Sequence, residues 1–116
     1  MTQDLQPHER IRARSEFQRV YDRGCRIHGR YMTLLVLPTQ RSAPRLGVAA
    51  TKKLGGAVWR NRAKRIVREI FRRNKISAGV DVVVVPRREM FKVSFAALEA
   101  DFRAAAGRRP RGAHAS

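Results

Sequence analysis

The spacing of apolar residues changes several times along this chain, and each change predicts a new element. Near the start, Phe17, Val20 and Tyr21 recur at helical spacing, which predicts a short amphipathic helix. The four residues from Ser15, Ser-Glu-Phe-Gln, form a capping-box pattern that makes Ser15 the expected cap. Gly24 is expected to end the helix in a left-handed conformation.

Extended apolar stretches predict the strands of one sheet. Arg30–Leu37 predicts a strand that ends at Pro38, and Arg45–Thr51 predicts a second. A short extended piece at Cys25–Gly29 is expected to precede them. Val80–Val85 (VDVVVV) is too uniformly apolar for a half-exposed strand, so we expect it at the centre of the sheet.

Two further helices follow from apolar residues spaced three and four apart. The stripe of the first comprises Ala63, Ile66, Val67, Ile70 and Phe71, preceded by Trp59 one turn earlier. The last helix is expected to begin after Ser94, which caps it, and to stop at Gly107. Its apolar side contains Phe95, Leu98, Phe102 and Ala105.

Together these elements predict a single domain of the α+β class. Their order is helix, two or three strands, helix, strand, helix, which favours a sandwich with one central sheet. The domain is expected to span residues 15–107. A flexible basic arm, residues 1–14, should precede it, and a disordered basic tail, residues 108–116, should follow it.

The helix around Trp59 is basic on the face opposite its apolar stripe. That face, at about 100° per residue, carries Asn61, Arg65, Arg68 and Arg72. Residues 51–75 hold ten of the 26 basic residues and one carboxylate, Glu69, which is expected to pair with Arg65 or Arg73. A merely solvated face mixes both signs, whereas this one is nearly all positive. We therefore expect a partner that supplies negative charge.

The whole chain is strongly basic. Its 116 residues carry 26 Lys and Arg against 9 Asp and Glu, which gives a net charge of +17 and a pI of about 11.8. Arginine outnumbers lysine, which favours bidentate contacts with phosphate. Nucleic acid is the leading expected partner, and an anionic membrane surface is the other candidate.

The chain offers little that points to a membrane or to secretion. Its apolar runs, Met32–Leu37 and Val82–Val85, are too short to span a bilayer. The first ten residues are polar and do not resemble a signal peptide. Cys25 is the only cysteine, which excludes an intrachain disulfide and favours a reducing cytoplasm.

Side chains suited to catalysis are sparse. Cys25 and His28 form an isolated C-x-x-H, whereas a zinc site needs three or four ligands. The other histidines, His8 and His114, lie in the arm and the tail. Residues 24–30 have the glycine spacing of a phosphate loop but lack its Lys and Ser/Thr. The side chains therefore indicate a binding protein with no catalytic residue and no metal site of its own.

Two separated blocks resemble a known family. Lys52–Phe71, KKLGGAVWRNRAKRIVREIF, closely resembles the signature of the bacterial ribonuclease P protein subunit, in which a K-K-x-G-x-A-V loop runs into an R-N-R-x-K-R helix. SEFQRVYDRG at residues 15–24 is similar to the family's first helix, and RLGVAATKK at 45–53 to its central strand. The resemblance covers roughly residues 8–106. Gly56 departs from it, because family members commonly carry Asn there.

The resemblance implies a fold and a function. The fold is an α-β-β-β-α-β-α sandwich, similar to a ribosomal-protein domain, with a left-handed βαβ crossover that is opposite to the general rule. The function is to bind a large catalytic RNA and precursor tRNA, with no protein partner required. That RNA, using Mg²⁺, removes the 5′ leader by hydrolysis, so the protein would be the non-catalytic subunit of an endoribonuclease.

The resemblance also places the basic helix against the catalytic RNA. The expected contacts come from Arg60, Asn61, Arg62, Lys64, Arg65 and Arg68. Asn61 can donate and accept hydrogen bonds, and its alternative role is to satisfy backbone groups at the helix start. We interpret Trp59 as an anchor of the helix in the core, with stacking on RNA as the lesser alternative.

Two aromatic residues are candidates for contacting the leader. By spacing alone, Phe17 and Tyr21 are more often core residues than ligand contacts. The resemblance implies instead that they line a cleft against the sheet, where unpaired leader nucleotides stack. The leader backbone would follow cations at the strand ends, namely Lys52, Lys53, Arg87 and Arg88.

Other nucleic-acid-binding proteins remain alternatives. A ribosomal or other structural RNA-binding protein would have similar charge, size and fold, and only the linked K-K-x-G-x-A-V and R-N-R blocks separate it from this interpretation. A DNA-binding module is a weaker alternative. Its recognition helix usually follows another helix, whereas the basic helix here follows a strand.

Overall fold

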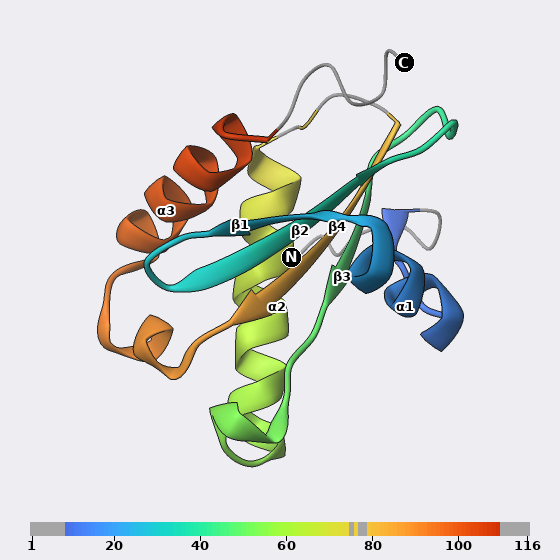
Figure 1. Ribbon diagram of the computed structural model, residues 1–116. Coiled ribbons are helices and arrows are strands. Elements are labelled where there is room, and N and C mark those ends of the chain that lie inside the picture. Colours follow the sequence, from blue (N-terminus) through green and yellow to red (C-terminus); the bar gives the residue numbers. More distant parts are fainter. Residues whose placement is uncertain (1–8, 75, 77–78, 110–116) are drawn as a thin grey trace.

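A computed structural model describes residues 9–74, 76 and 79–109 of the chain (Figure 1). In these residues, helices flank both faces of one four-stranded sheet. The helices are α1 (Arg14–Arg23), α2 (Ala57–Arg73) and α3 (Phe95–Gly107). The strands are β1 (Cys25–His28), β2 (Met32–Pro38), β3 (Arg45–Val48) and β4 (Val80–Pro86), and the short 3-10 turns are η2 (Lys52–Leu54) and η3 (Arg88–Lys92). The predicted α+β class and the order of elements are confirmed.

The sheet is mixed, with strand order β1-β2-β4-β3. β2 pairs antiparallel with β1 and with β4, and β3 pairs parallel with β4. Val83 of β4 therefore lies between Leu35 of β2 and Gly47 of β3. This confirms that the valine-rich segment is central. β3 ends at Val48, three residues earlier than predicted, because the chain then leaves the sheet toward η2.

Helix α2 connects the parallel strands β3 and β4. In Figure 1 both strands run downward, β4 lies to the left of β3, and α2 crosses behind the sheet. This geometry makes the crossover left-handed. It is the hand that the family resemblance implied and the opposite of the common one.

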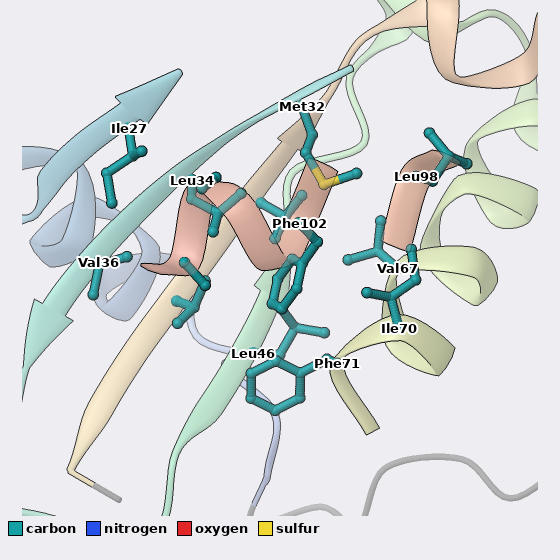
Figure 2. Packing of buried hydrophobic residues seen from close by; sticks show 14 of the residues in the cluster. Ile27, Met32, Leu34, Val36, Leu46, Val67, Ile70, Phe71, Leu98 and Phe102 are labelled. Atoms are coloured by element: carbon teal, nitrogen blue, oxygen red, sulfur yellow. The ribbon is translucent and has the colours of Figure 1, made fainter. Parts of the chain in front are cut away.

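The larger apolar cluster lies between the sheet and the helices α2 and α3 (Figure 2). Its members include Leu34, Leu46, Val67, Ile70, Leu98 and Phe102. Each fully buried side chain of this size stabilises the fold by roughly 1.5–3 kcal/mol relative to exposure. Ser94 caps α3 as predicted, since its Oγ accepts a hydrogen bond from the Ala97 N–H at 3.1 Å.

A smaller cluster lies on the opposite face of the sheet, under α1. It comprises Ile11, Val20, Leu35 and Val83. Ile11 is only 5% exposed and donates its N–H to the Leu46 carbonyl at 2.9 Å. The packed domain therefore includes residue 11, upstream of the boundary predicted at residue 15. Residues 1–8 of the predicted arm and 110–116 of the predicted tail lie outside the described residues.

Helix α1 begins earlier than predicted, and the expected Ser15 cap is wrong. The capping position is Ala13, which has no side chain that can accept a hydrogen bond. Instead, the Glu16 carboxylate accepts the backbone N–H groups of Ala13 at 3.3 Å and Arg12 at 3.4 Å. Only the glutamate contact of a capping box is therefore present, and the capping position lies two residues before the predicted one.

Helix α1 ends before Gly24 as predicted, but not through a left-handed residue. Gly24 has a φ of −74°, which any residue can adopt. A Cβ atom there would lie 2.5 Å from the Val20 carbonyl oxygen, which is far closer than carbon and oxygen can approach. Glycine is therefore required for space and not for its backbone freedom.

Candidate nucleic-acid interface

Helix α2 is held against the sheet by the predicted apolar stripe. Ala63, Val67 and Ile70 are fully buried, and Phe71 is 4% exposed. Ile66 is partly buried against the same cluster. This interpretation of the stripe is confirmed, and it leaves the opposite face of α2 to solvent.

None of the six residues predicted to contact RNA, all of them on α2, is buried. Three are exposed, Asn61, Arg62 and Arg65, and three are half-buried, Arg60, Lys64 and Arg68. The six lie within about 12 Å along the helix axis, at 1.5 Å per residue. One rigid element thus presents all six candidate contacts together.

The pairing of Glu69 differs from the prediction. Its carboxylate accepts two hydrogen bonds from the Arg72 guanidinium, at 2.6 and 3.1 Å. The hydrogen bond from Arg72 holds the pKa of Glu69 below its usual value. Arg73 lies instead 3.5 Å from Glu99 of α3. Glu69 is the only carboxylate in the sequence of α2, and residues 57–68 of the helix contain none.

Trp59 is not the core anchor that the sequence analysis expected. Its side chain is 44% exposed, and its ring packs 4.8 Å from the Phe91 ring, centroid to centroid. The Arg62 guanidinium carbon lies 5.8 Å from the Trp59 ring centroid. The reason is visible in Figure 1, where the first turn of α2 extends past the edge of the sheet. Trp59 therefore packs at the margin of the larger cluster, against Phe91, and not inside it.

Phe17 and Tyr21 lie on α1, on the other side of the sheet. Phe17 is half-buried against the smaller cluster. Its ring lies directly over β3, because a Cβ atom at Gly47 would be 2.7 Å from Phe17 Cζ. Tyr21, one turn later, is 38% exposed. The two aromatics therefore share a face of α1 but meet different surroundings.

The environment of Tyr21 is partly desolvated and positively charged. Burial raises the pKa of its hydroxyl, and the nearby Arg26 opposes that shift. Arg26 is exposed on β1, at the edge of the sheet. Tyr21 thus offers an uncharged aromatic ring beside a cation, which suits a nucleotide.

The strand-end cations are distributed less simply than predicted. Lys52 and Lys53 are exposed on η2, and Arg88 is exposed on η3. Arg87 is half-buried, and its guanidinium donates to the Gly29 carbonyl at 2.6 Å and to Thr33 Oγ1 at 2.8 Å. Thr33 lies two residues before Leu35 and points to the same face of the sheet, so Arg87 lies on the α1 side. Arg87 is therefore held in place on that face.

Two interactions that fix these surfaces were missed from the sequence. Arg45 of β3 is 7% exposed and forms a bidentate pair with Asp81 of β4, at 3.0 and 2.8 Å. Its third contact is Glu16 of α1 at 2.9 Å, which lowers the pKa of Glu16. This network docks α1 on the sheet. The available signal was Asp81 within a run of valines, since a buried carboxylate requires a partner.

Asp101 of α3 is the second missed residue. Its carboxylate accepts the backbone N–H groups of Arg30 and Tyr31, both at 2.8 Å. Gly29 is required beside it, because a Cβ atom there would lie 2.8 Å from Asp101 Oδ2. The turn between β1 and β2 is thereby fixed to α3.

Within residues 9–74, 76 and 79–109, no three His, Cys, Asp or Glu side chains gather as a metal site would require. None of the helices in that part of the chain is long and apolar enough to cross a bilayer.

Comparison with known proteins decides the family. The family model described as Ribonuclease P matches residues 5–109. The chain belongs to the ribonuclease P protein family. The ribonuclease P protein component of Syntrophus aciditrophicus is 38% identical over 94 residues, which is 79% of each chain. That of Thermotoga maritima is 39% identical over 92 residues, 78% of this chain and 79% of its own.

Solved structures of ribonuclease P proteins share this fold. The protein from Thermotoga maritima aligns with a TM-score of 0.80 at 35% identity, covering 89% of this chain and 99% of its own. The protein from Staphylococcus aureus aligns with a TM-score of 0.76 at 28% identity, covering 85% and 93%. The family resemblance and the fold class predicted from sequence are thereby confirmed.

Proposed function

We propose that this protein is the RNA-binding subunit of ribonuclease P. In this role it binds the catalytic RNA through the solvent face of α2 and the 5′ leader of precursor tRNA through the α1 side of the sheet. The RNA hydrolyses the phosphodiester bond that releases the leader. The assembly would work in the cytoplasm and produce the mature 5′ end of tRNA.

The observation that carries the proposal is the one-sided charge of α2 in a chain of this family. One face of the helix is buried, while the exposed side presents Asn61, Arg62 and Arg65, and Glu69, the one carboxylate in the helix sequence, is bound to Arg72. Guanidinium groups bind phosphate oxygens through paired hydrogen bonds. An RNA backbone supplies the missing negative charge.

The proposed role of the α1 side follows from substrate selection. Only precursor tRNA has a leader, so a protein that contacts the leader favours precursor over product. Tyr21 supplies an exposed ring for stacking, and Arg87, held by Gly29 and Thr33, supplies a positioned guanidinium. Phe17 supports this face from its position against the sheet.

In this proposal the magnesium ions belong to the RNA. The two buried carboxylates of the described residues already bind other groups of the protein. Asp81 pairs with Arg45, and Asp101 accepts a backbone N–H of the β1–β2 turn. Carboxylates that are bound in this way do not fit a metal centre of the protein. The chain's own contribution is to bind, to orient and to neutralise phosphate charge.

The test is to identify the RNA that accompanies the protein. The tagged protein would be purified at moderate salt and the bound RNA sequenced. We expect a single long structured RNA together with precursor tRNAs. Recovery of ribosomal RNA in its place would support a structural ribosomal role and contradict the proposal.

A further inference from the structure

Trp59 and Val58 form an exposed apolar patch in the first turn of α2. Trp59 is 44% exposed and Val58 is 78% exposed. Neither side chain is used to fill the core, and Tyr21, the other exposed large apolar side chain of the described residues, lies across the sheet. Two adjacent exposed apolar side chains outside the core form the kind of apolar patch that can mark a binding surface.

The Trp59 ring is held in a fixed orientation. Its edge packs on the backbone at Gly55, where a Cβ atom would lie 3.1 Å from Trp59 Cδ1. Gly55 has a φ of 120°, a conformation that also favours glycine. Phe91, itself packed on the larger cluster, supports the ring at 4.8 Å. A ring that is already ordered loses little conformational entropy when a ligand stacks on it.

The surroundings of the ring are positively charged. Arg62 lies 5.8 Å from the ring centroid, within the range of a cation–π contact but farther than a tightly stacked plane. Lys53 and Lys92 are exposed on the neighbouring turns η2 and η3. The first turn of α2 carries no acidic residue, and its start adds the positive end of the helix dipole.

This combination favours RNA over protein as the occupant. The centres of protein–protein interfaces are depleted in charged residues, whereas Arg62 lies over this ring and Lys53 and Lys92 are exposed on the turns next to its packing partners. Single-stranded nucleic acid is bound by aromatic side chains set within positively charged grooves, because the base stacks on the ring while the phosphates pair with the cations. The patch also continues directly into the basic face of α2.

We propose that Trp59 is a stacking platform for an unpaired base of the ribonuclease P RNA, with Arg62 binding the adjoining phosphate. The proposal rests on the proposed function and adds to it a contact that does not depend on charge. It also assigns Trp59 a role different from that of the six polar residues on the same helix.

Trp59 is the only tryptophan of the chain, so its fluorescence reports this site alone. Stacking on a nucleobase quenches indole emission. The full-length protein would be titrated with ribonuclease P RNA while binding is followed in parallel by gel shift. We expect quenching that saturates with the bound fraction. A fully paired RNA duplex should bind through charge and leave the emission nearly unchanged.

Variants separate stacking from charge. Trp59→Ala should weaken binding of ribonuclease P RNA by about five- to 150-fold, the range for one stacked base, and leave the salt dependence of binding unchanged. Trp59→Phe should retain most of the affinity. Arg62→Ala should instead make the salt dependence shallower. Val58→Ala removes exposed apolar surface without removing a ring, and it should change affinity less than about twofold. Melting temperatures of all variants establish that they fold.

The outcomes are distinguishable. RNA binding without quenching, together with wild-type affinity of Trp59→Ala, would overturn the platform while leaving the proposed function intact. Failure of the wild-type protein to bind ribonuclease P RNA would remove the proposed function itself. In a third outcome, tryptophan emission changes with protein concentration in the absence of RNA, and sedimentation changes in both Trp59→Ala and Val58→Ala. These two results together would show that the patch joins two copies of the chain, and they would overturn the platform.

Discussion

Phe17 and Tyr21 lie one helical turn apart, yet their surroundings give them different roles. Phe17 lies over the backbone of β3 at Gly47 and packs against the smaller apolar cluster. Tyr21 is 38% exposed and lies near Arg26. The sequence could show that both face the same way but not which one the sheet covers. That depends on Gly47, whose missing side chain makes room for the Phe17 ring.

Replacing these two residues should therefore have separable effects. Phe17→Ala should lower the free energy of unfolding by about 2–4 kcal/mol, because it leaves a cavity over β3. Tyr21→Ala should cost about 1 kcal/mol or less of stability but lose about 1–3 kcal/mol of affinity for precursors with a leader. Melting temperature and leader-dependent affinity of the assembled enzyme, measured for both variants, check this. If Tyr21→Ala lost as much stability as Phe17→Ala and its affinity for precursors did not depend on the leader, Tyr21 would be removed from the site.

Glu16 gives the docking of α1 a pH dependence. The hydrogen bond from Arg45 lowers the pKa of Glu16 below its usual 4.5, so ionised Glu16 stabilises the folded state above that pH. This contribution is lost as pH falls through the lowered pKa. Glu16→Gln should be less stable than the wild type by about 1–2 kcal/mol at neutral pH. The difference should shrink below pH 4.5.

Denaturant unfolding between pH 7 and pH 3 measures this difference. Glu89→Gln, at an exposed carboxylate of η3, is the matched control and should match the wild type at each pH. A Glu16→Gln deficit that stays constant over the whole range would show that the pair with Arg45 does not stabilise the docked helix.

At the scale of elements, α2 illustrates what periodicity can and cannot predict. The apolar stripe and the basic face were both predictable, because a helix repeats every 3.6 residues whatever surrounds it. The exposure of the Trp59 side chain was not predictable, because periodicity indicates which face of a helix a residue lies on but not where the sheet ends. The pairing of Glu69 with Arg72 also depended on side-chain conformation, since three arginines lay within reach.

The basic face of α2 should determine the salt dependence of RNA binding. If roughly six phosphates are neutralised, the slope of log affinity against log salt concentration should be about −4 to −5. Arg65→Ala and Arg68→Ala should each make it shallower by about one. Arg72→Ala is the control, because Glu69 already compensates its charge, and it should change the slope less. Unchanged slopes for Arg65→Ala and Arg68→Ala would mean that this face does not contact RNA.

The start of α2 offers a stabilising substitution. Gly56 occupies the capping position with a φ of −72°, and no side chain caps the helix there. A Cβ atom at Gly56 would meet nothing within 4 Å. Gly56→Asn should therefore stabilise the protein by about 0.5–1 kcal/mol, through a cap and a less flexible unfolded chain. Thermal unfolding checks this, with Gly56→Ala as the variant that lacks the cap. A lower melting temperature for Gly56→Asn would contradict it.

For the whole molecule, the sheet separates two candidate RNA-binding surfaces. Helix α2 and the larger cluster lie on one face, and α1 with the smaller cluster lies on the other (Figure 1). The central place of β4 followed from its valine-rich sequence, because a strand that is apolar throughout must be covered on both faces. The order and direction of the other strands did not follow from it. The docking of the two layers did not follow from the sequence. It rests on contacts between distant residues, such as Arg45 with Asp81 and Asp101 with the β1–β2 turn.

This arrangement makes a direct prediction about substrate choice. In the proposed function, one surface holds the catalytic RNA while the other remains available for the leader. The protein should therefore add affinity for precursor tRNA and add little for mature tRNA. Each stacked leader base should contribute about 1–3 kcal/mol, or roughly five- to 150-fold.

The measurement compares ribonuclease P RNA alone with the same RNA bound to this protein. Affinities are determined for mature tRNA and for precursors with leaders of increasing length, and protein without RNA serves as the control that should not cleave. The protein is expected to strengthen binding progressively as the leader grows, until the α1 face is filled, and to leave mature tRNA nearly unaffected. An equal gain for mature and precursor tRNA, independent of leader length, would contradict the account.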